Sequence, residues 1–195
     1  MADAAELAMT EINDAGGVLD GTMLESVRAD STCIDNGAAT AAAERLVTGD
    51  GVAAIMGADC SGVTGAVLAN VAVPNGVPMI STSATSPGLS TAEDNGLFFR
   101  TAPSDARQGE VLANILDDKG IDEVAVTFTN NDYGKGLSNS FVSSFEEDGG
   151  TVTITLEEGD DYEEVYNENA KRVEDAVERE LVRRVSRKKA DAGDN

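Results

Sequence analysis

Histidine is absent from this chain of 195 residues, and so is tryptophan. Without histidine the chain lacks the usual general base near neutral pH and the commonest metal ligand, which excludes Ser-His catalytic pairs and His-zinc sites. Cysteine is scarce, because only Cys33 and Cys60 are present. Two cysteines are too few for a thiolate zinc site and too far apart here for a C-x-x-C redox motif. Their spacing leaves open either two buried thiols or one bridge, and we expect neither a metal nor a cofactor.

Basic residues are also few, since 14 Lys and Arg stand against 36 Asp and Glu, a formal net charge of -22. Such a charge repels phosphate backbones and anionic lipid headgroups, so we expect no nucleic-acid partner. Nor does any apolar run approach the roughly 18 residues that a membrane span requires. The first residues lack the basic and apolar regions of a signal peptide. The chain is therefore expected to be soluble, without membrane insertion, and any export signal is either absent or already removed.

Hydrophobic residues make up 41% of the chain, which is enough for a real core. Helical spacing of apolar residues alternates with short apolar or alternating runs that are typical of strands. We expect helices within residues 3–14, 35–51, 61–76, 105–120 and 136–150, and strands within 23–30, 52–58, 77–81, 97–103, 122–129 and 151–158. This alternation predicts an α/β fold with parallel sheets and flanking helices, in which ligands bind at the carboxyl ends of the strands.

The residues from 162 to 189 differ from the rest, because they contain neither Gly nor Pro and interleave acidic with basic side chains. They predict one long amphipathic, charged helix. Such a helix could pack on its own domain, pair with another helix so that the chain self-associates through residues 165–189, or be an added, design-like segment. We thus divide the chain into a first α/β segment, a second α/β segment and a charged helix with its tail, over residues 1–102, 103–160 and 161–195.

Small hydroxyl side chains gather where two predicted strands end. Ser83 and Thr85 follow the strand at 77–81, and Ser61 opens the helix that follows the preceding strand. The free N–H groups of a helix start favour an anion, whereas hydroxyl and carbonyl oxygens accept hydrogen bonds from an ammonium group. The alternative is that Ser61 is merely an N-cap and the hydroxyl run an ordinary turn.

Five segments, in this order and spacing, are similar to a known family. They are "AAELAMTEINDAGG", "ERLVTGDGVAAIMGADCSG", "NGVPMISTSATSPGLS", "LFFRTAPSDARQGEVLANIL" and "NDYGKGLSNSF". Together they resemble the periplasmic substrate-binding proteins of branched-chain amino-acid ABC transporters, of the Leu/Ile/Val-binding type with a type I periplasmic binding fold. The resemblance runs from about Ala4 to Glu158. It implies two lobes joined by a hinge, expected near Arg100 to Pro103, with a small amino acid held between them.

The resemblance also assigns residues. It implies that Ser61 binds the ligand carboxylate, that Ser83 and Thr85 take the ammonium and carboxylate ends, and that Tyr133 reaches across from the second lobe. Relatives carry a disulfide at the matching positions, which implies a bridge between the two cysteines. It further implies a periplasmic location and a membrane permease as partner.

The sequence also departs from this family. Members normally begin with a strand before the first helix and continue well beyond residue 160, so we expect an incomplete two-lobe architecture, truncated at both ends, plus the charged helix. The alternative function is a truncated or redesigned scaffold that binds no small molecule and assembles through its C-terminal helix. An enzyme is not expected. The segment "NDYGKGLS" resembles a phosphate loop only weakly, because Thr129 replaces its first glycine and Gly136 its hydroxyl residue.

Overall fold

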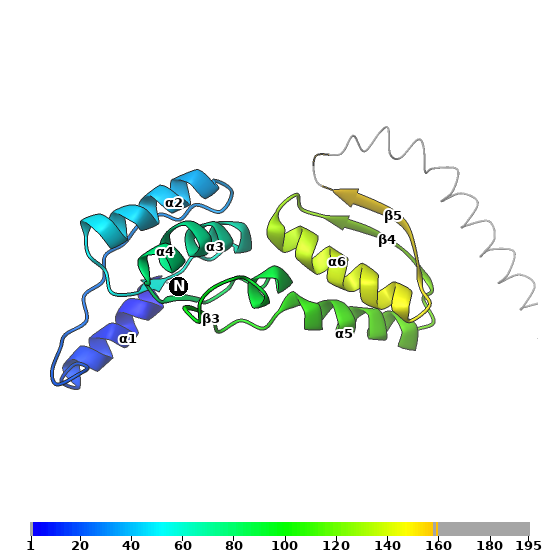
Figure 1. Cartoon of the computed structure of the whole chain (residues 1–195). Coiled ribbons are helices and arrows are strands. Elements are labelled where there is room, and N and C mark those ends of the chain that lie inside the picture. The colour runs from blue at the N-terminus through cyan, green and yellow to red at the C-terminus, as the bar shows by residue number, and fades with distance from the viewer. Residues whose placement is uncertain (1, 158, 160–195) are drawn as a thin grey trace, which may run out of the picture. The chain divides into compact units, whose positions relative to one another are not determined.

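The computed structural model describes residues 2–157 and 159. Contacts between residues divide the chain into two compact units, Met1–Ser104 and Asp105–Asn195, and each is described by itself (Figure 1). Within the residues described, no helix combines the length and the apolar character needed to cross a bilayer. The helix predicted over residues 162–189 lies outside the described part of the chain, and so does its proposed self-association.

The first unit contains a parallel sheet of three short strands. They are β1 (Ile55–Met56), β2 (Met79–Ser81) and β3 (Phe98–Arg100), paired in the order β1-β2-β3. In register, Ile55 lies opposite Met79, and Ser81 lies opposite Arg100. The parallel α/β prediction is confirmed. Because the three strands run in one direction, their carboxyl ends share one edge of the sheet.

Two helical segments pack together beside this sheet (Figure 1). The first is α2 (Asn36–Glu44), continued by a π-helical turn, and the Asp35 carboxylate caps it by accepting from the Ala38 N–H at 2.9 Å. The second runs from α3 (Ser61–Val67) through a π-helical turn into α4 (Val73–Asn75). Their small and branched side chains line the core, in which Leu68, Met79, Val63 and Val71 are the largest side chains that are completely buried.

The predicted strand at residues 23–30 is wrong, because the structure contains no strand there. The backbone at Leu24 instead bonds to a side chain, since the Asn13 amide accepts from the Leu24 N–H and donates to its carbonyl. Arg28 ties the same segment to Asp3 and Glu6 of α1 (Ala2–Asp14), and its hydrogen bond lowers the pKa of the Glu6 carboxyl. The apolar face predicted for α1 is not covered, because none of its residues is buried.

One face of the three-stranded sheet carries a row of exposed apolar side chains. Met56, Ile80 and Phe99 lie side by side in register on β1, β2 and β3. They are 46%, 38% and 57% exposed, whereas Met79, one residue before Ile80, is 1% exposed. Side chains alternate between the two faces of a strand. The sheet is therefore packed on one face and bare on the other.

The second unit pairs two strands with two helices. The strands β4 (Glu123–Phe128) and β5 (Thr151–Glu157) are parallel, and α5 (Asp105–Asp118) packs along α6 (Asp132–Glu147) (Figure 1). Helix α6 begins four residues before the predicted start at 136, because the Asn131 side chain caps it by accepting from the Gly134 N–H at 2.9 Å. Sequence reasoning overlooked this cap.

Glycine at position 109 sets how closely α5 and α6 approach, and its replacement is our first prediction. A Cβ at Gly109 would lie 2.6 Å from the Phe141 nitrogen and 2.7 Å from the Ser140 carbonyl carbon. Both are backbone atoms of α6, so Gly109→Ala should destabilise the unit by about 1–3 kcal/mol, although alanine favours an isolated helix by about 1 kcal/mol. Urea denaturation followed by circular dichroism measures the change.

The matched control is Gly65→Ala in α3, where the added Cβ comes no closer than 3.9 Å to the end of the Leu89 side chain. That variant should be neutral or more stable by up to about 1 kcal/mol. Equal effects of the two substitutions would show that close helix packing at position 109 is unimportant.

Candidate ligand-binding site

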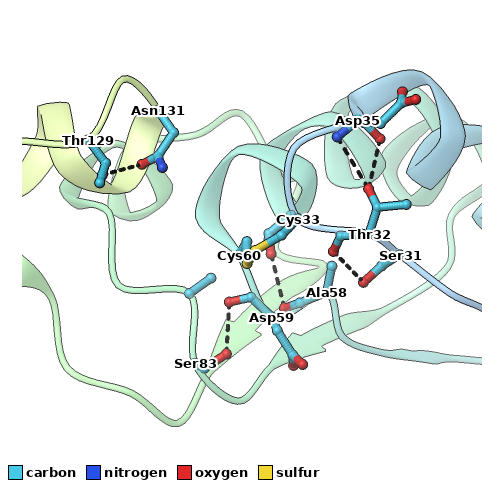
Figure 2. Close-up of a disulfide and its surroundings, with 12 residues drawn as sticks. Ser31, Thr32, Cys33, Asp35, Ala58, Asp59, Cys60, Ser83, Thr129 and Asn131 are labelled. Carbon is cyan, nitrogen blue, oxygen red and sulfur yellow. Dashed lines mark hydrogen bonds between the residues drawn. A yellow bond between two sulfur atoms is a disulfide. The ribbon is translucent and has the colours of Figure 1, made fainter. Parts of the chain in front are cut away.

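The two hydroxyl-bearing segments predicted to converge lie against each other in the first unit. After β1 the chain runs through Asp59 into Ser61, and after β2 it runs through Ser83 to Ser86. Ser83 Oγ donates to the Asp59 carbonyl oxygen at 2.7 Å, as Figure 2 shows. The Ser86 N–H donates to Ser61 Oγ at 3.1 Å. These two hydrogen bonds join the carboxyl ends of neighbouring strands into one surface.

The direction of each hydrogen bond decides which of the two hydroxyls can still donate to a ligand and which can still accept from it. A hydroxyl has one proton to donate and two lone pairs. Ser61 Oγ accepts from Ser86 and so keeps its proton for another partner, and the residue is 3% exposed. Ser83 gives its proton to Asp59 and keeps lone pairs. Thr85 is half-buried and lies between Ser83 and Ser86 in the sequence. Ser61 and Ser83 therefore offer a ligand one hydrogen-bond donor, at Ser61, and one acceptor, at Ser83.

Two fully buried hydroxyls support these residues from beneath. Ser81 and Thr64 both donate to the Ala58 carbonyl oxygen, at 2.6 and 3.0 Å. Ser81 Oγ also accepts from the Ala84 N–H at 3.1 Å. Ser81 belongs to the same hydroxyl run as Ser83 and Thr85, yet its bonds are all internal. It fixes the turn that follows β2.

A disulfide anchors the start of α3, as the family resemblance implied. Cys33 and Cys60 are bonded, with their Cα atoms 5.4 Å apart and 27 positions apart in sequence (Figure 2). Cys60 is the N-cap residue of α3, directly before Ser61. The bridge thus ties Ser61 to the segment that precedes α2.

One cavity of the first unit lies beside these residues rather than among them. It measures about 180 Å³ and is lined by β1 and the residues 57–59 that follow it, by Thr82 after β2 and by alanines of α2, but not by Ser61, Ser83 or Thr85. Sequence reasoning did not select Asp59, and it counted Thr82 among the hydroxyls after the strand at 77–81 without giving it a ligand contact. Position just after a strand was the signal available for them.

Tyr133 belongs to the second unit, in the first turn of α6. It is 43% exposed and lines a separate cavity of about 340 Å³ with Thr129, Leu137 and Phe141. Its approach to a ligand held by the first unit stays a prediction. In the described residues no three acidic or cysteine side chains gather in a way that could hold a metal ion.

The parallel α/β fold is that of the type I periplasmic-binding class of ligand-binding proteins. The family described as "Receptor family ligand binding region" matches residues 1–184, and the chain belongs to this family. It is a family of ligand-binding receptors and not of enzymes, as expected.

Three similar proteins illustrate the kinship. The Leu/Ile/Val-binding protein BraC3 of Rhizobium johnstonii is 31% identical over 153 residues, and glutamate receptor 3.1 of Oryza sativa subsp. japonica is 34% identical over 133 residues. The crystal structure of an ABC transporter substrate-binding protein from Desulfitobacterium hafniense in complex with Leu superposes with a TM-score of 0.70 at 27% identity.

Coverage differs between this chain and its relatives. The matches take in 78%, 68% and 87% of this chain but only 40%, 14% and 50% of BraC3, the glutamate receptor and the Desulfitobacterium protein. The chain thus spans half or less of the length of these proteins.

Proposed function

We propose that this chain binds a small amino acid, as the solute receptor of an ABC importer does. The observation that carries the proposal is the pair of hydrogen bonds from Ser83 to Asp59 and from Ser86 to Ser61, which leaves a donor and an acceptor at one edge of the sheet. A zwitterion needs both kinds of partner, and hydroxyls provide them without burying a net charge. Kinship with Leu/Ile/Val-binding proteins supports the same class of ligand.

In the proposed mode, the Ser61 hydroxyl donates to the ligand carboxylate. The first N–H groups of the helical run that begins at Ser61 have no intrahelical partner, so they add donors on the same side. Ser83 accepts from the ammonium group, and Thr85 contacts the head group between them. Tyr133 closes over the ligand from the second unit.

The proposal extends to partner and location. A membrane permease of the ABC type would receive the loaded protein, as in the transporters of its relatives. The disulfide suits an oxidising compartment, which supports a periplasmic location. A non-binding scaffold that assembles through its C-terminal helix remains the alternative, and a flat response to every amino acid in the experiment below would favour it.

Titration calorimetry and thermal melting across the twenty amino acids test the binding proposal. A ligand that binds only the folded state stabilises it by about 2.7 kcal/mol at a concentration of 100 Kd. We expect such a shift with aliphatic or small polar amino acids. Absence of heat and of any melting shift with all twenty would refute present-day binding by this chain.

Ser61→Ala provides the sharper second prediction. Loss of a hydrogen bond to a charged carboxylate costs about 1.5–3 kcal/mol, so affinity should fall about tenfold to a hundredfold. The control is Ser26→Ala, because Ser26 is an exposed serine of the same unit that bonds to Glu6. Equal affinities of the two variants would remove Ser61 from the site.

A further inference from the structure

Arg100 reaches from the end of β3 to the loop that follows β2. Its Nη1 donates to the carbonyl oxygens of Ser86 at 2.9 Å and of Ala84 at 3.3 Å, and its Nη2 donates to Ser90 Oγ. The residue is half-buried, and Ser81 at the end of β2 is its neighbour in register. One guanidinium therefore holds three acceptors along a single loop, which its planar fork of five donors permits.

The same two loop residues are held at their N–H groups as well. The Ala84 N–H donates to Ser81 Oγ and the Ser86 N–H to Ser61 Oγ, each at 3.1 Å. Both backbone groups of the residues before and after Thr85 are thus engaged. Arg100 donates to the carbonyl groups of these residues, and the oxygens of the buried Ser81 and Ser61 accept from their N–H groups.

The charge of Arg100 is not neutralised by these contacts, since all three acceptors are neutral. Among the residues that the structure describes, Arg100 takes part in no ion pair. The backbone of Ser86 links the guanidinium to Ser61, because Ser86 bonds to Arg100 through its carbonyl and to Ser61 Oγ through its N–H. A cation in this position favours an anionic group beside Ser61.

We propose that Arg100 is a positioning residue of the candidate site, which fixes the 84–86 segment and turns the carboxylate end of a zwitterion toward Ser61. The part of this inference that concerns the ligand rests on the proposed function. The part that concerns the loop rests on the hydrogen bonds alone. Through Ser86, Arg100 keeps the Ser61 oxygen in its accepting role, so that the hydroxyl proton stays directed at the ligand. Its charge then adds selectivity for a carboxylate over a neutral group.

Amide hydrogen exchange without ligand tests the loop, with Arg100→Gln and Arg100→Lys compared. Both variants should exchange the Ser86 amide at least tenfold faster than the original chain, because neither side chain reaches three acceptors at once. Arg45→Gln is the control, as Arg45 is an exposed arginine of the same unit that pairs with Asp50. Unchanged exchange at Ser86 in both Arg100 variants overturns the proposal.

Affinity for leucine and for leucinamide tests the charge. Leucinamide keeps the ammonium group and side chain but lacks the carboxylate. Arg100→Gln should weaken leucine binding at least tenfold and leucinamide binding much less, whereas Arg100→Lys, which keeps the charge, should retain most of the preference for leucine. A purely structural role would weaken both ligands equally, and that result contradicts the proposal.

The two arms keep this inference separate from the proposed function. Failure of the original chain to bind leucine or any other amino acid refutes the proposed function and, with it, the carboxylate selectivity. The exchange arm still decides whether Arg100 holds the loop. If Arg100→Gln does not fold, Arg100→Lys provides the same exchange comparison with the charge retained.

Discussion

Replacement of both Cys33 and Cys60 by serine is expected to lower the free energy of unfolding of the first unit by about 3 kcal/mol, because a bridge that closes a loop of this size restricts the unfolded chain. The loop spans 27 positions. For a unit of about 100 residues, this loss corresponds to a fall in melting temperature on the order of 10–20 °C. Thermal denaturation by circular dichroism measures it.

A reducing agent supplies the internal control for this prediction. It should lower the melting temperature of the original chain to that of the serine variant and leave the variant itself unchanged. Because Cys60 caps α3 directly before Ser61, the loss should also loosen the candidate site. If reduction left the original chain as stable as before, the bridge would contribute nothing.

Phe145→Ala should have the largest effect in the second unit. The ring is 1% exposed, lies 5.5 Å from the ring of Phe141, and packs on the backbone of Gly150, where a Cβ would meet it at 2.5 Å. Truncation of a buried phenylalanine costs about 3–5 kcal/mol. We expect the amides of β4, β5 and α6 to lose most of their protection from hydrogen exchange.

Phe99→Ala is the matched control, since it makes the same chemical change at a side chain that is 57% exposed. It should cost less than about 1 kcal/mol. Phe145→Leu keeps most of the apolar volume and serves as the measurable variant if Phe145→Ala does not fold. Similar losses of stability for Phe145→Ala and Phe99→Ala would show that the burial of Phe145 is unimportant for this unit.

Local patterns predicted most of the regular elements, because the helices carry clear apolar spacing and are bounded by glycine or by Asp and Asn caps. The failure at residues 23–30 has a physical cause. A strand exists only through its neighbours, and alternation of side chains cannot reveal that the Asn13 amide would satisfy the backbone at Leu24. For the same reason, the pattern of α1 could not show that its apolar face stays uncovered.

The position of the candidate site in the fold could be predicted from the sequence, but the hydrogen bonds between its residues could not. Position after neighbouring parallel strands was enough to bring Ser61 and Ser83 into one region. The direction of each hydrogen bond, and the reach of Arg100 from the next strand, depend on coordinates. Sequence reasoning considered Arg100 only as the start of a predicted hinge and gave its side chain no role, whereas the structure shows that this side chain bonds to the loop after β2.

The exposed apolar face of the three-stranded sheet favours association between molecules, whereas the net charge of the chain opposes it. Met56, Ile80 and Phe99 form an exposed apolar row, while the chain as a whole carries a net charge of -22. At low ionic strength, electrostatic repulsion between the negatively charged molecules opposes contact between their exposed apolar rows. Added salt shortens the range of that repulsion and leaves the attraction between carbon surfaces intact. We therefore expect added salt to favour association of these molecules through the exposed face of the sheet.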